Sequence, residues 1–207
     1  MDDAFLARAH RALRRRDPVL GAVVRRIGPP KLQRRGGVYR SLLRSILFQQ
    51  LAGSAARAIE KRFLALYGGR YPQPPALLGT RDPRLRKAGL SRQKIAAMKA
   101  VARAFRDGDV RPRRFPSMSD EEFVAAVTEI RGIGEWTAHM TLMFSLGRPD
   151  VLPVGDYGVR KGIQQLYGLA ELPRPPELER IAEPWRPYRT VASWYVWRHL
   201  DPVVGGG

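Results

Sequence analysis

Apolar residues recur every three to four positions along most of the chain, and glycines or prolines interrupt this spacing between segments. The period is that of an α-helix with one buried face, and no segment shows the strict alternation of a half-buried strand, so the pattern predicts an all-α protein. Residues 38–51 are apolar on most of the helical circumference, which predicts a buried central helix. The predicted helices run from Pro18 to Gly28, over 38–51, from Ser54 to Gly68, from Ser91 to about Phe105, from Ser119 to the turn at Gly132, from about Trp136 to Gly147, from Asp156 to about Gly168, and over 177–183 and 187–199.

Helix start signals support several of these boundaries. Asp17 precedes Pro18 as an N-cap precedes a proline at the first helical position. Ser54 and Ser91 are further cap candidates, and Ser119 with a Glu three residues later forms a capping-box pattern. The segments 71–83 and 110–118 lack helical periodicity and are predicted to be connections.

The chain is strongly basic. Lys and Arg number 37 against 19 Asp and Glu, a formal net charge of +18, and residues 1–40 alone hold 11 basic and three acidic residues. Such an excess indicates a polyanionic partner, either nucleic acid or an anionic membrane surface. Only six of the 37 are Lys, and an Arg bias can also reflect coding composition, so charge favours nucleic acid without deciding the matter.

The composition also excludes several kinds of site. The chain has no Cys, which excludes disulfides, thiolate zinc sites, iron-sulfur clusters and a cysteine nucleophile, and its three scattered His disfavour a histidine metal site. The first residues lack the apolar run of a signal peptide, and no window approaches the ~20 apolar residues of a membrane helix. We expect a soluble, cytoplasmic protein without a membrane partner.

The segment Ile130-Arg131-Gly132-Ile133-Gly134-Glu135-Trp136-Thr137-Ala138 predicts two helices joined by a Gly-Ile-Gly turn. Glycines let the backbone turn sharply and let its amides approach a phosphate, while Ile133 would anchor the turn by burying its side chain. A helix corner with a glycine C-cap is the ordinary alternative, and the same hairpin also occurs in non-catalytic DNA-binding modules. The hairpin therefore indicates DNA but no chemistry.

The chemistry rests on a carboxylate that lies after the hairpin in the sequence. Asp156, in Leu152-Pro153-Val154-Gly155-Asp156-Tyr157, fits a helix N-cap, a role that is compatible with catalysis because a cap is held rigidly. Trp136, Met140 and Met143 share one helical face, and such a face is usually core. With Tyr157, Trp194 and Trp197 they could instead supply aromatic surface for an extruded base.

Four segments together resemble the helix-hairpin-helix (HhH-GPD) DNA glycosylase superfamily, and most closely its AlkA-type 3-methyladenine DNA glycosylase II branch. The resemblance spans about Val38 to Leu200. The segments are Ser45-Ile46-Leu47-Phe48-Gln49-Gln50-Leu51, the Gly132-Ile133-Gly134-x-Trp136-Thr137-Ala138 hairpin, Pro153-Val154-Gly155-Asp156, and Trp185-Arg186-Pro187-Tyr188-Arg189 ahead of Trp197.

The resemblance implies a two-lobed helical fold with the active-site cleft between the lobes. We expect one unit over 1–207, with a central lobe at about 38–130, a second lobe of 1–37 plus 131–207, and the hairpin at 119–147. Double-stranded DNA containing alkylated bases would be the partner of a nucleoid-associated monomer.

The resemblance also assigns roles to residues. Asp156 becomes the catalytic acid residue, and the flipped base lies near Trp136, Met140, Tyr157, Trp197 and Phe48. DNA contacts fall to Gln50 or Leu51 as the wedge in the duplex, to the hairpin residues Gly132, Ile133, Gly134 and Thr137, and to Arg160. No cofactor is implied for the chemistry, but a sodium or potassium ion would be held by the backbone carbonyls of Thr128, Ile130 and Ile133.

The resemblance further implies the reaction type. Bifunctional relatives carry a Lys where this chain has Trp136, so we expect base excision by hydrolysis of the N-glycosidic bond without strand cleavage. 3-Methyladenine and 7-methylguanine are the expected substrates. Two alternatives stay open: a non-catalytic DNA-binding protein, and a glycosylase for other lesions such as deaminated or etheno purines.

Overall fold

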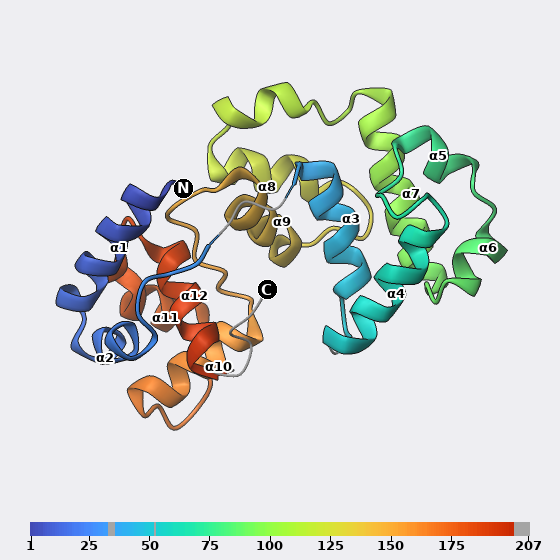
Figure 1. Cartoon of the computed structure of the whole chain (residues 1–207). Helices are drawn as coiled ribbons and strands as arrows, with labels where there is room; N and C mark the ends of the chain where they lie inside the picture. The colour runs from blue at the N-terminus through green and yellow to red at the C-terminus, as the bar shows by residue number, and fades with distance from the viewer. Residues whose placement is uncertain (33–35, 52, 201–207) are drawn as a thin grey trace. The chain divides into compact units, whose positions relative to one another are not determined.

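A computed structural model of the chain describes residues 1–32, 36–51 and 53–200. Within these ranges the structure is helical and contains no β-strand, which confirms the all-α prediction (Figure 1). No helix in the described ranges has both the length and the apolar character to cross a bilayer. The elements are α1 (Asp3–Arg16), α2 (Pro18–Ile27), α3 (Val38–Phe48), α4 (Gly53–Ala65), α5 (Pro74–Gly79), α6 (Asp82–Lys87), α7 (Arg92–Asp107), η1 (Pro112–Ser117), α8 (Asp120–Thr128), α9 (Glu135–Thr141), the π-helical turn η2 (Leu142–Leu146), α10 (Tyr157–Tyr167), α11 (Pro175–Ala182), η3 (Glu183–Trp185) and α12 (Arg189–Leu200).

The chain forms two compact units. Met1–Arg34 and Leu142–Gly207 make up one, here called the terminal unit, and Arg35–Thr141 makes up the other, the central unit. The boundary predicted at residue 130 is therefore wrong, because residues 131–141 belong to the central unit. The reason is that α9 packs against α3 and α8 of that unit.

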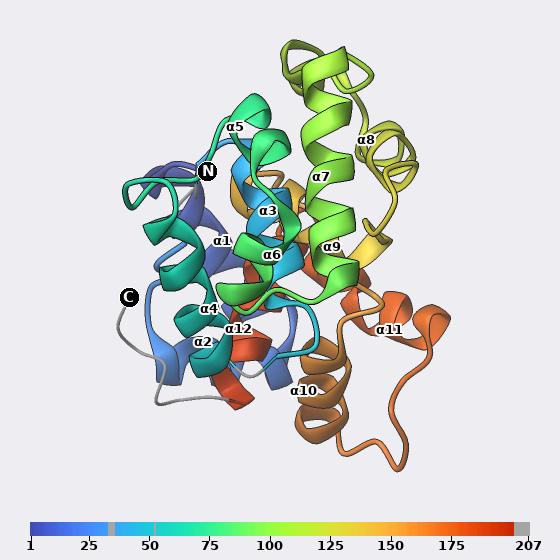
Figure 2. The ribbon, with the colours of Figure 1, turned by 90° about the vertical axis from the view of Figure 1, so that its right-hand side faces the viewer.

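The central unit is built around α3, as its apolar circumference predicts. Leu42, Leu43, Ile46 and Leu47 are fully buried, and α3 packs against α4, α7 and α9. Helix α7 also carries α5 and α6 along its side (Figure 2). Each fully buried Leu or Ile stabilises the fold by roughly 1.5–3 kcal/mol relative to an exposed one, so α3 is a rigid base for the residues after Phe48.

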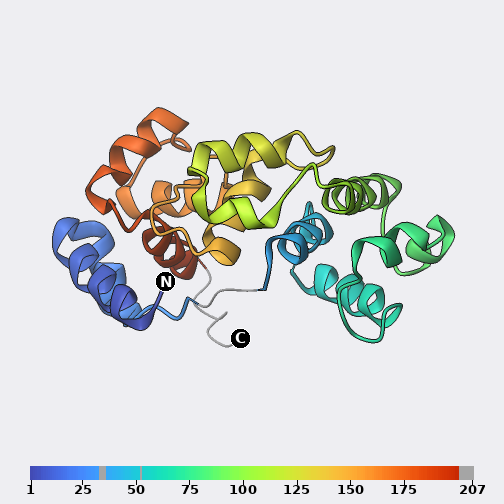
Figure 3. The same ribbon diagram turned by 90° about the horizontal axis from the view of Figure 1, so that it is seen from above.

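The terminal unit brings N-terminal and C-terminal helices together: α1 packs against α12 and η3, and α2 packs against α12 and α10 (Figure 3). Asp17, the predicted N-cap of α2, accepts the backbone N–H groups of Val19 and Leu20 at 2.9 and 3.0 Å. Its second oxygen accepts from the Trp185 indole at 2.7 Å and from the Tyr167 hydroxyl. A buried carboxylate needs such donors to offset its lost hydration, so Asp17 joins α2 to α10 and η3.

Several elements differ from the prediction. α1 was not predicted, although Asp2 caps it and Leu6, Ala9 and Leu13 bury one face. α5, α6 and η1 lie in or across the predicted connections, and each has a proline in its first turn, where proline is compatible with a helix. α4 begins at Gly53, so Ser54 lies inside it and is not its cap.

Candidate active site

Asp156 is held at the start of α10 by two hydrogen bonds to one oxygen. Its Oδ1 accepts the backbone N–H of Val159 at 2.7 Å, which confirms the predicted N-cap, and the indole N–H of Trp197 at 2.8 Å. The residue is 9% exposed. Trp197 lies on α12, so two helices of the terminal unit fix the orientation of this carboxylate, and the positive end of the α10 dipole lies next to its charge.

Two glycines of α10 allow this approach. A Cβ on Gly158 would lie 3.0 Å from Cδ1 of Trp197 and 3.1 Å from Oδ1 of Asp156. A Cβ on Gly162, one turn later, would lie 2.4 Å from a methyl group of Val196 on α12. Glycine at both positions therefore lets α10 and α12 pack closely enough for the bond between Asp156 and Trp197, and a Cβ at 158 would displace its neighbours by a few tenths of an ångström.

The aromatic residues of the terminal unit take different positions. The Trp197 ring lies 6.0 Å from that of Phe144, centroid to centroid, at an interplanar angle of 31°. Trp194 instead packs edge-on against Tyr195 and lies under the guanidinium of Arg198. Tyr157, next to Asp156, is 66% exposed. Trp197 thus contacts the carboxylate, and Tyr157 presents its ring to the surface.

The helix-hairpin-helix lies in the central unit. The capping box at Ser119 and Glu122 starts α8 as predicted. The turn is closed by the Ile133 N–H, which donates to the carbonyl of Ile130 at 3.0 Å. Ile133 is buried, which confirms its predicted anchoring role.

The two hairpin glycines serve different purposes. Gly132 has φ of 89°, and a Cβ there would lie 2.4 Å from Cβ of Ala97 on α7. Its missing side chain therefore serves packing and backbone conformation, and the approach of its backbone to a phosphate stays a prediction. A Cβ on Gly134 would meet nothing within 4 Å, so Gly134 is the glycine beside open space.

The residues after α3 leave the helix abruptly. Gln50 is exposed and has φ of 56°, a conformation rare outside glycine, and Leu51 is 37% exposed. The end of α3 is secured by Lys94, whose ammonium donates to the Leu47 carbonyl at 2.7 Å. Both candidate wedge residues therefore project from a fixed helix end.

Gln49 lies in the family segment 45–51, but the sequence prediction gave it no role. Its side-chain amide donates to the Gly132 carbonyl at 3.3 Å and to the Thr137 hydroxyl at 3.5 Å. It thereby joins the helix end that carries Gln50 to the hairpin. The available signal was an amide side chain at the end of an otherwise apolar helix.

The other predicted base-binding residues of the central unit are partly or wholly covered. The ring of Phe48 lies 4.0 Å from the Arg44 guanidinium carbon, in a cation–π contact. Trp136 is half-buried in the first turn of α9, whereas Thr137 and Met140 are buried. Burial lowers the pKa of His139 on the same helix, and Glu135 and Asp120 partly offset this effect.

The remaining predicted residues have defined local partners. Arg160, expected to contact DNA, donates through Nε to the Pro173 carbonyl at 3.0 Å. The Thr128 hydroxyl donates to the Val124 carbonyl at 2.8 Å. Among the residues that the structure describes, no three His, Cys, Asp or Glu side chains gather as metal ligands.

The candidate residues divide between the units. The terminal unit holds Asp156, Tyr157, Arg160 and Trp197, and the central unit holds the hairpin, the end of α3 and the first turns of α9. Within each unit the structure brings together residues that are far apart in sequence, Asp156 with Trp197 and Gln49 with Gly132.

Comparisons with known proteins find relatives of this chain. Residues 43–187 match the family described as "HhH-GPD superfamily base excision DNA repair protein". The chain is 35% identical over 162 residues to DNA-3-methyladenine glycosylase 1 of Schizosaccharomyces pombe, covering 77% of this chain and 71% of that protein.

Solved structures give the same result. The 3-methyladenine DNA glycosylase of S. pombe in complex with abasic DNA superposes with a TM-score of 0.85 at 32% identity, covering 92% of this chain and 95% of that one. The DNA-3-methyladenine glycosidase of Bacillus halodurans gives 0.80 at 34% identity, covering 93% and 89%. The resemblance inferred from the residues is confirmed, and the chain belongs to the HhH-GPD superfamily of base excision DNA repair proteins.

Proposed function

We propose that this chain is a DNA-3-methyladenine glycosylase, which removes N-alkylated purines, 3-methyladenine and 7-methylguanine, from double-stranded DNA and acts as a monomer. The relatives' names support the substrate class. The observation that carries the proposal for this chain is the fixed carboxylate of Asp156, which accepts from both Val159 and Trp197. A DNA-binding module needs a hairpin and positive charge, and an N-cap role for Asp156 accounts for the bond from Val159 but not for the second bond, from Trp197.

The proposed reaction is hydrolysis at the anomeric carbon. Alkylation at N3 or N7 places positive charge on the purine, so the base leaves with the electron pair of the C1′–N bond and needs no strong general acid. The Asp156 carboxylate stabilises the cationic sugar and orients the attacking water or accepts its proton. The water oxygen bonds to C1′, and the products are the free base and an abasic site.

DNA binding in this proposal uses the central unit. Backbone amides near Gly134, beside open space, hold a phosphate. Gln50 or Leu51 fills the gap left in the duplex when the base is flipped out. Recognition of the base itself is proposed to use electron-rich rings, with Trp136 of the central unit and Tyr157 and Trp197 of the terminal unit as candidates, because cation–π attraction to a cationic base is worth roughly 0.5–2 kcal/mol.

The enzyme is proposed to be monofunctional. A lyase step needs an amine that attacks C1′ to form a Schiff base. The residue at the start of α9 that would carry this amine is Trp136, whose indole cannot do so. Excision would therefore leave the abasic strand intact.

A monovalent cation at the hairpin is part of the proposal. The carbonyls of Thr128, Ile130 and Ile133 are hard oxygen ligands from one short turn, of the type that sodium or potassium prefers. The Ile130 oxygen accepts the Ile133 N–H, and a carbonyl has a second lone pair for a cation. Such an ion would add positive charge at the turn, where it would favour the binding of a DNA phosphate.

The proposal is tested by incubating the protein with DNA that carries defined lesions and measuring the released base by chromatography. Release of 3-methyladenine and 7-methylguanine supports it. Binding to the same DNA without release of any base would favour the non-catalytic alternative. Release confined to deaminated or etheno purines would identify the other glycosylase class.

A further inference from the structure

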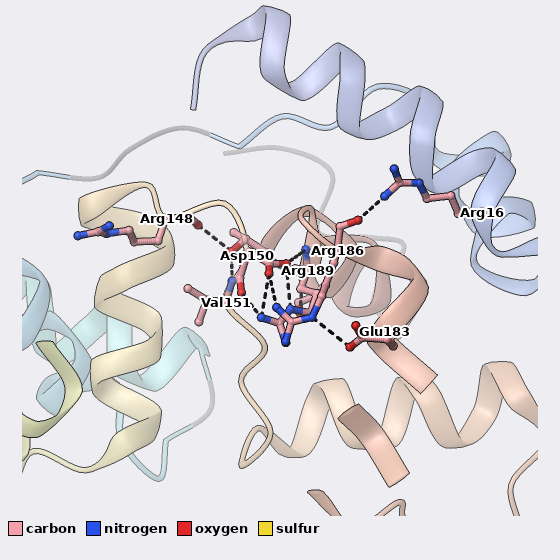
Figure 4. Close-up of polar contacts among 9 residues, drawn as sticks. Arg16, Arg148, Asp150, Val151, Glu183, Arg186 and Arg189 are labelled. Atoms are coloured by element: carbon pink, nitrogen blue, oxygen red, sulfur yellow. Dashed lines mark hydrogen bonds and ion pairs between the residues drawn. The ribbon is translucent and has the colours of Figure 1, made fainter. Parts of the chain in front are cut away.

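The segment Trp185–Arg189 and the loop before Asp156 form a polar cluster in the terminal unit that the proposed chemistry does not use (Figure 4). Asp150 lies at its centre, with Arg186 and Arg189 directed at its carboxylate. Arg186 also pairs with Glu183, and its carbonyl accepts from Arg16 of α1. The loop, η3, α12 and α1 therefore meet at one group of charges.

The pair of Asp150 and Arg189 has the geometry of a strong interaction. Nε of Arg189 donates to Oδ1 at 2.9 Å, and Nη2 donates to Oδ2 at 2.9 Å and to the Asp150 carbonyl at 2.8 Å. The side chains are only 15% and 22% exposed, whereas that of Arg186 is 48% exposed. Bidentate pairs of this kind add directional specificity to charge attraction. The guanidinium of Arg189 therefore has its charge paired with Asp150 and is mostly covered.

Thr190 makes a second attachment at the same place. Its hydroxyl donates to the Arg148 carbonyl at 2.8 Å and accepts from the Val151 N–H at 3.1 Å. Its own backbone N–H donates to the Pro149 carbonyl at 3.1 Å. The first turn of α12 is thereby fixed to the start of the loop through backbone as well as side-chain groups.

The same loop and the same helix meet again at the catalytic carboxylate. The loop ends at Asp156, and α12 carries Trp197 eight residues after Arg189, roughly 12 Å along the helix axis. The loop and α12 are thus joined at two places, at Arg189 and Thr190 and again at Trp197, so neither can shift along the α12 axis without breaking a contact. The contacts of Asp150 and Thr190 therefore bear on the position along α12 at which the Trp197 indole meets Asp156.

We propose that Asp150, Arg189 and Thr190 are positioning residues for excision, which act by holding α12 in register with the loop so that the Trp197 N–H orients the Asp156 carboxylate. This inference rests on the proposed function of Asp156. A residue that only stabilises the fold would change the folded fraction but leave the excision rate of folded protein unchanged.

The test uses the full chain with Arg189→Lys, which loses the bidentate geometry but keeps the charge, and Thr190→Val, which removes the hydroxyl contacts. Asp82→Asn is the control, because it breaks the pair of Asp82 and Lys99 in the central unit. Each variant is made alone and in combination with Asp156→Asn, and single-turnover release of 7-methylguanine is measured at saturating protein. The indole N–H resonance of Trp197, identified by its loss in Trp197→Phe, is recorded without DNA.

We expect Arg189→Lys and Thr190→Val to slow excision by about tenfold or more, as misplaced catalytic groups do, and to shift the Trp197 resonance. In combination with Asp156→Asn they should cause no further loss of excision rate. Asp82→Asn should match wild type in both readouts. Folded variants with the wild-type rate and resonance would overturn the inference, and so would an equal slowing in the Asp156→Asn background. If wild type releases no alkylated base, the proposed function fails, whereas the resonance still decides whether the register depends on Arg189.

Discussion

Substitution of Gly158 by Ala tests whether the geometry around Asp156 governs the reaction. The added Cβ would lie 3.0 Å from Cδ1 of Trp197 and 3.1 Å from both Nε1 of Trp197 and Oδ1 of Asp156. Ordinary contacts of this type begin near 3.4 Å. The indole and the carboxylate must therefore separate from the new methyl group by roughly 0.3–0.4 Å.

This displacement sets the expected effect on rate. A misplacement of about 1 Å can cost on the order of a hundredfold in rate, so a shift of roughly 0.4 Å corresponds to about a fivefold loss, or about 1 kcal/mol in the barrier. Stability should change little, because Ala in a helix gains about 0.5–1 kcal/mol over Gly and offsets the tight contact.

The assay is single-turnover release of 7-methylguanine at saturating protein, with thermal unfolding as the check on folding. Gly155→Ala is the matched control: it flanks Asp156 on the other side, and its Cβ would meet nothing within 4 Å. We expect a wild-type rate for Gly155→Ala and about a fivefold slower rate for Gly158→Ala. An unchanged or faster rate in folded Gly158→Ala protein would refute the reasoning.

Three further predictions concern the hairpin and its surroundings. Gly132→Ala should lower the free energy of unfolding by roughly 2 kcal/mol or more in urea titrations, because its Cβ would lie 2.4 Å from that of Ala97 at a φ of 89°. Gly134→Ala should change the free energy of unfolding by less than about 0.5 kcal/mol. Equal losses in the two variants would contradict this account of the turn. Burial lowers the pKa of His139 in the folded state, so as the pH falls through about 6.5 the unfolded chain gains a proton first and the folded state loses stability. The drop in Tm between pH 7.5 and 5.5 should therefore be smaller in His139→Gln than in wild type. An equal drop would show that this histidine does not contribute. Borohydride should trap no covalent adduct between the protein and DNA during excision, because Trp136 replaces the amine, and a trapped adduct would show a lyase step.

The hydrophobic pattern predicted most helices because their start signals are local. Asp17, Ser91, Ser119 and Asp156 all cap the helices they precede, and each makes its bond within three residues. The sequence predicts connections at 71–83 and 110–118, where the structure has α5, the start of α6 and η1. Proline ends a helix in most positions and is compatible with one only in the first turn, so these short helices carry no start signal that the pattern recognises.

The site was predictable only in part, because its geometry depends on contacts between distant segments. The resemblance named Asp156 and Trp197, but the hydrogen bond between them and the need for Gly158 depend on how closely α10 and α12 pack. The Gly-Ile-Gly spacing also predicts the same role, close approach to a phosphate, for Gly132 and Gly134. The two differ in the structure because only Gly132 lies against Ala97, a contact that the sequence does not show. The role of Gln49 was not predicted for the same reason, since its partners lie in the hairpin.

The central claim is that the Asp156 carboxylate performs the excision, and comparing wild type with Asp156→Asn tests it most directly. Single-turnover release of 3-methyladenine and 7-methylguanine is measured together with affinity for abasic DNA. Asn keeps the shape and can still accept the Val159 and Trp197 N–H groups, so we predict unchanged binding and a loss of release of about a hundredfold or more. Release by Asp156→Asn at the wild-type rate would contradict the account.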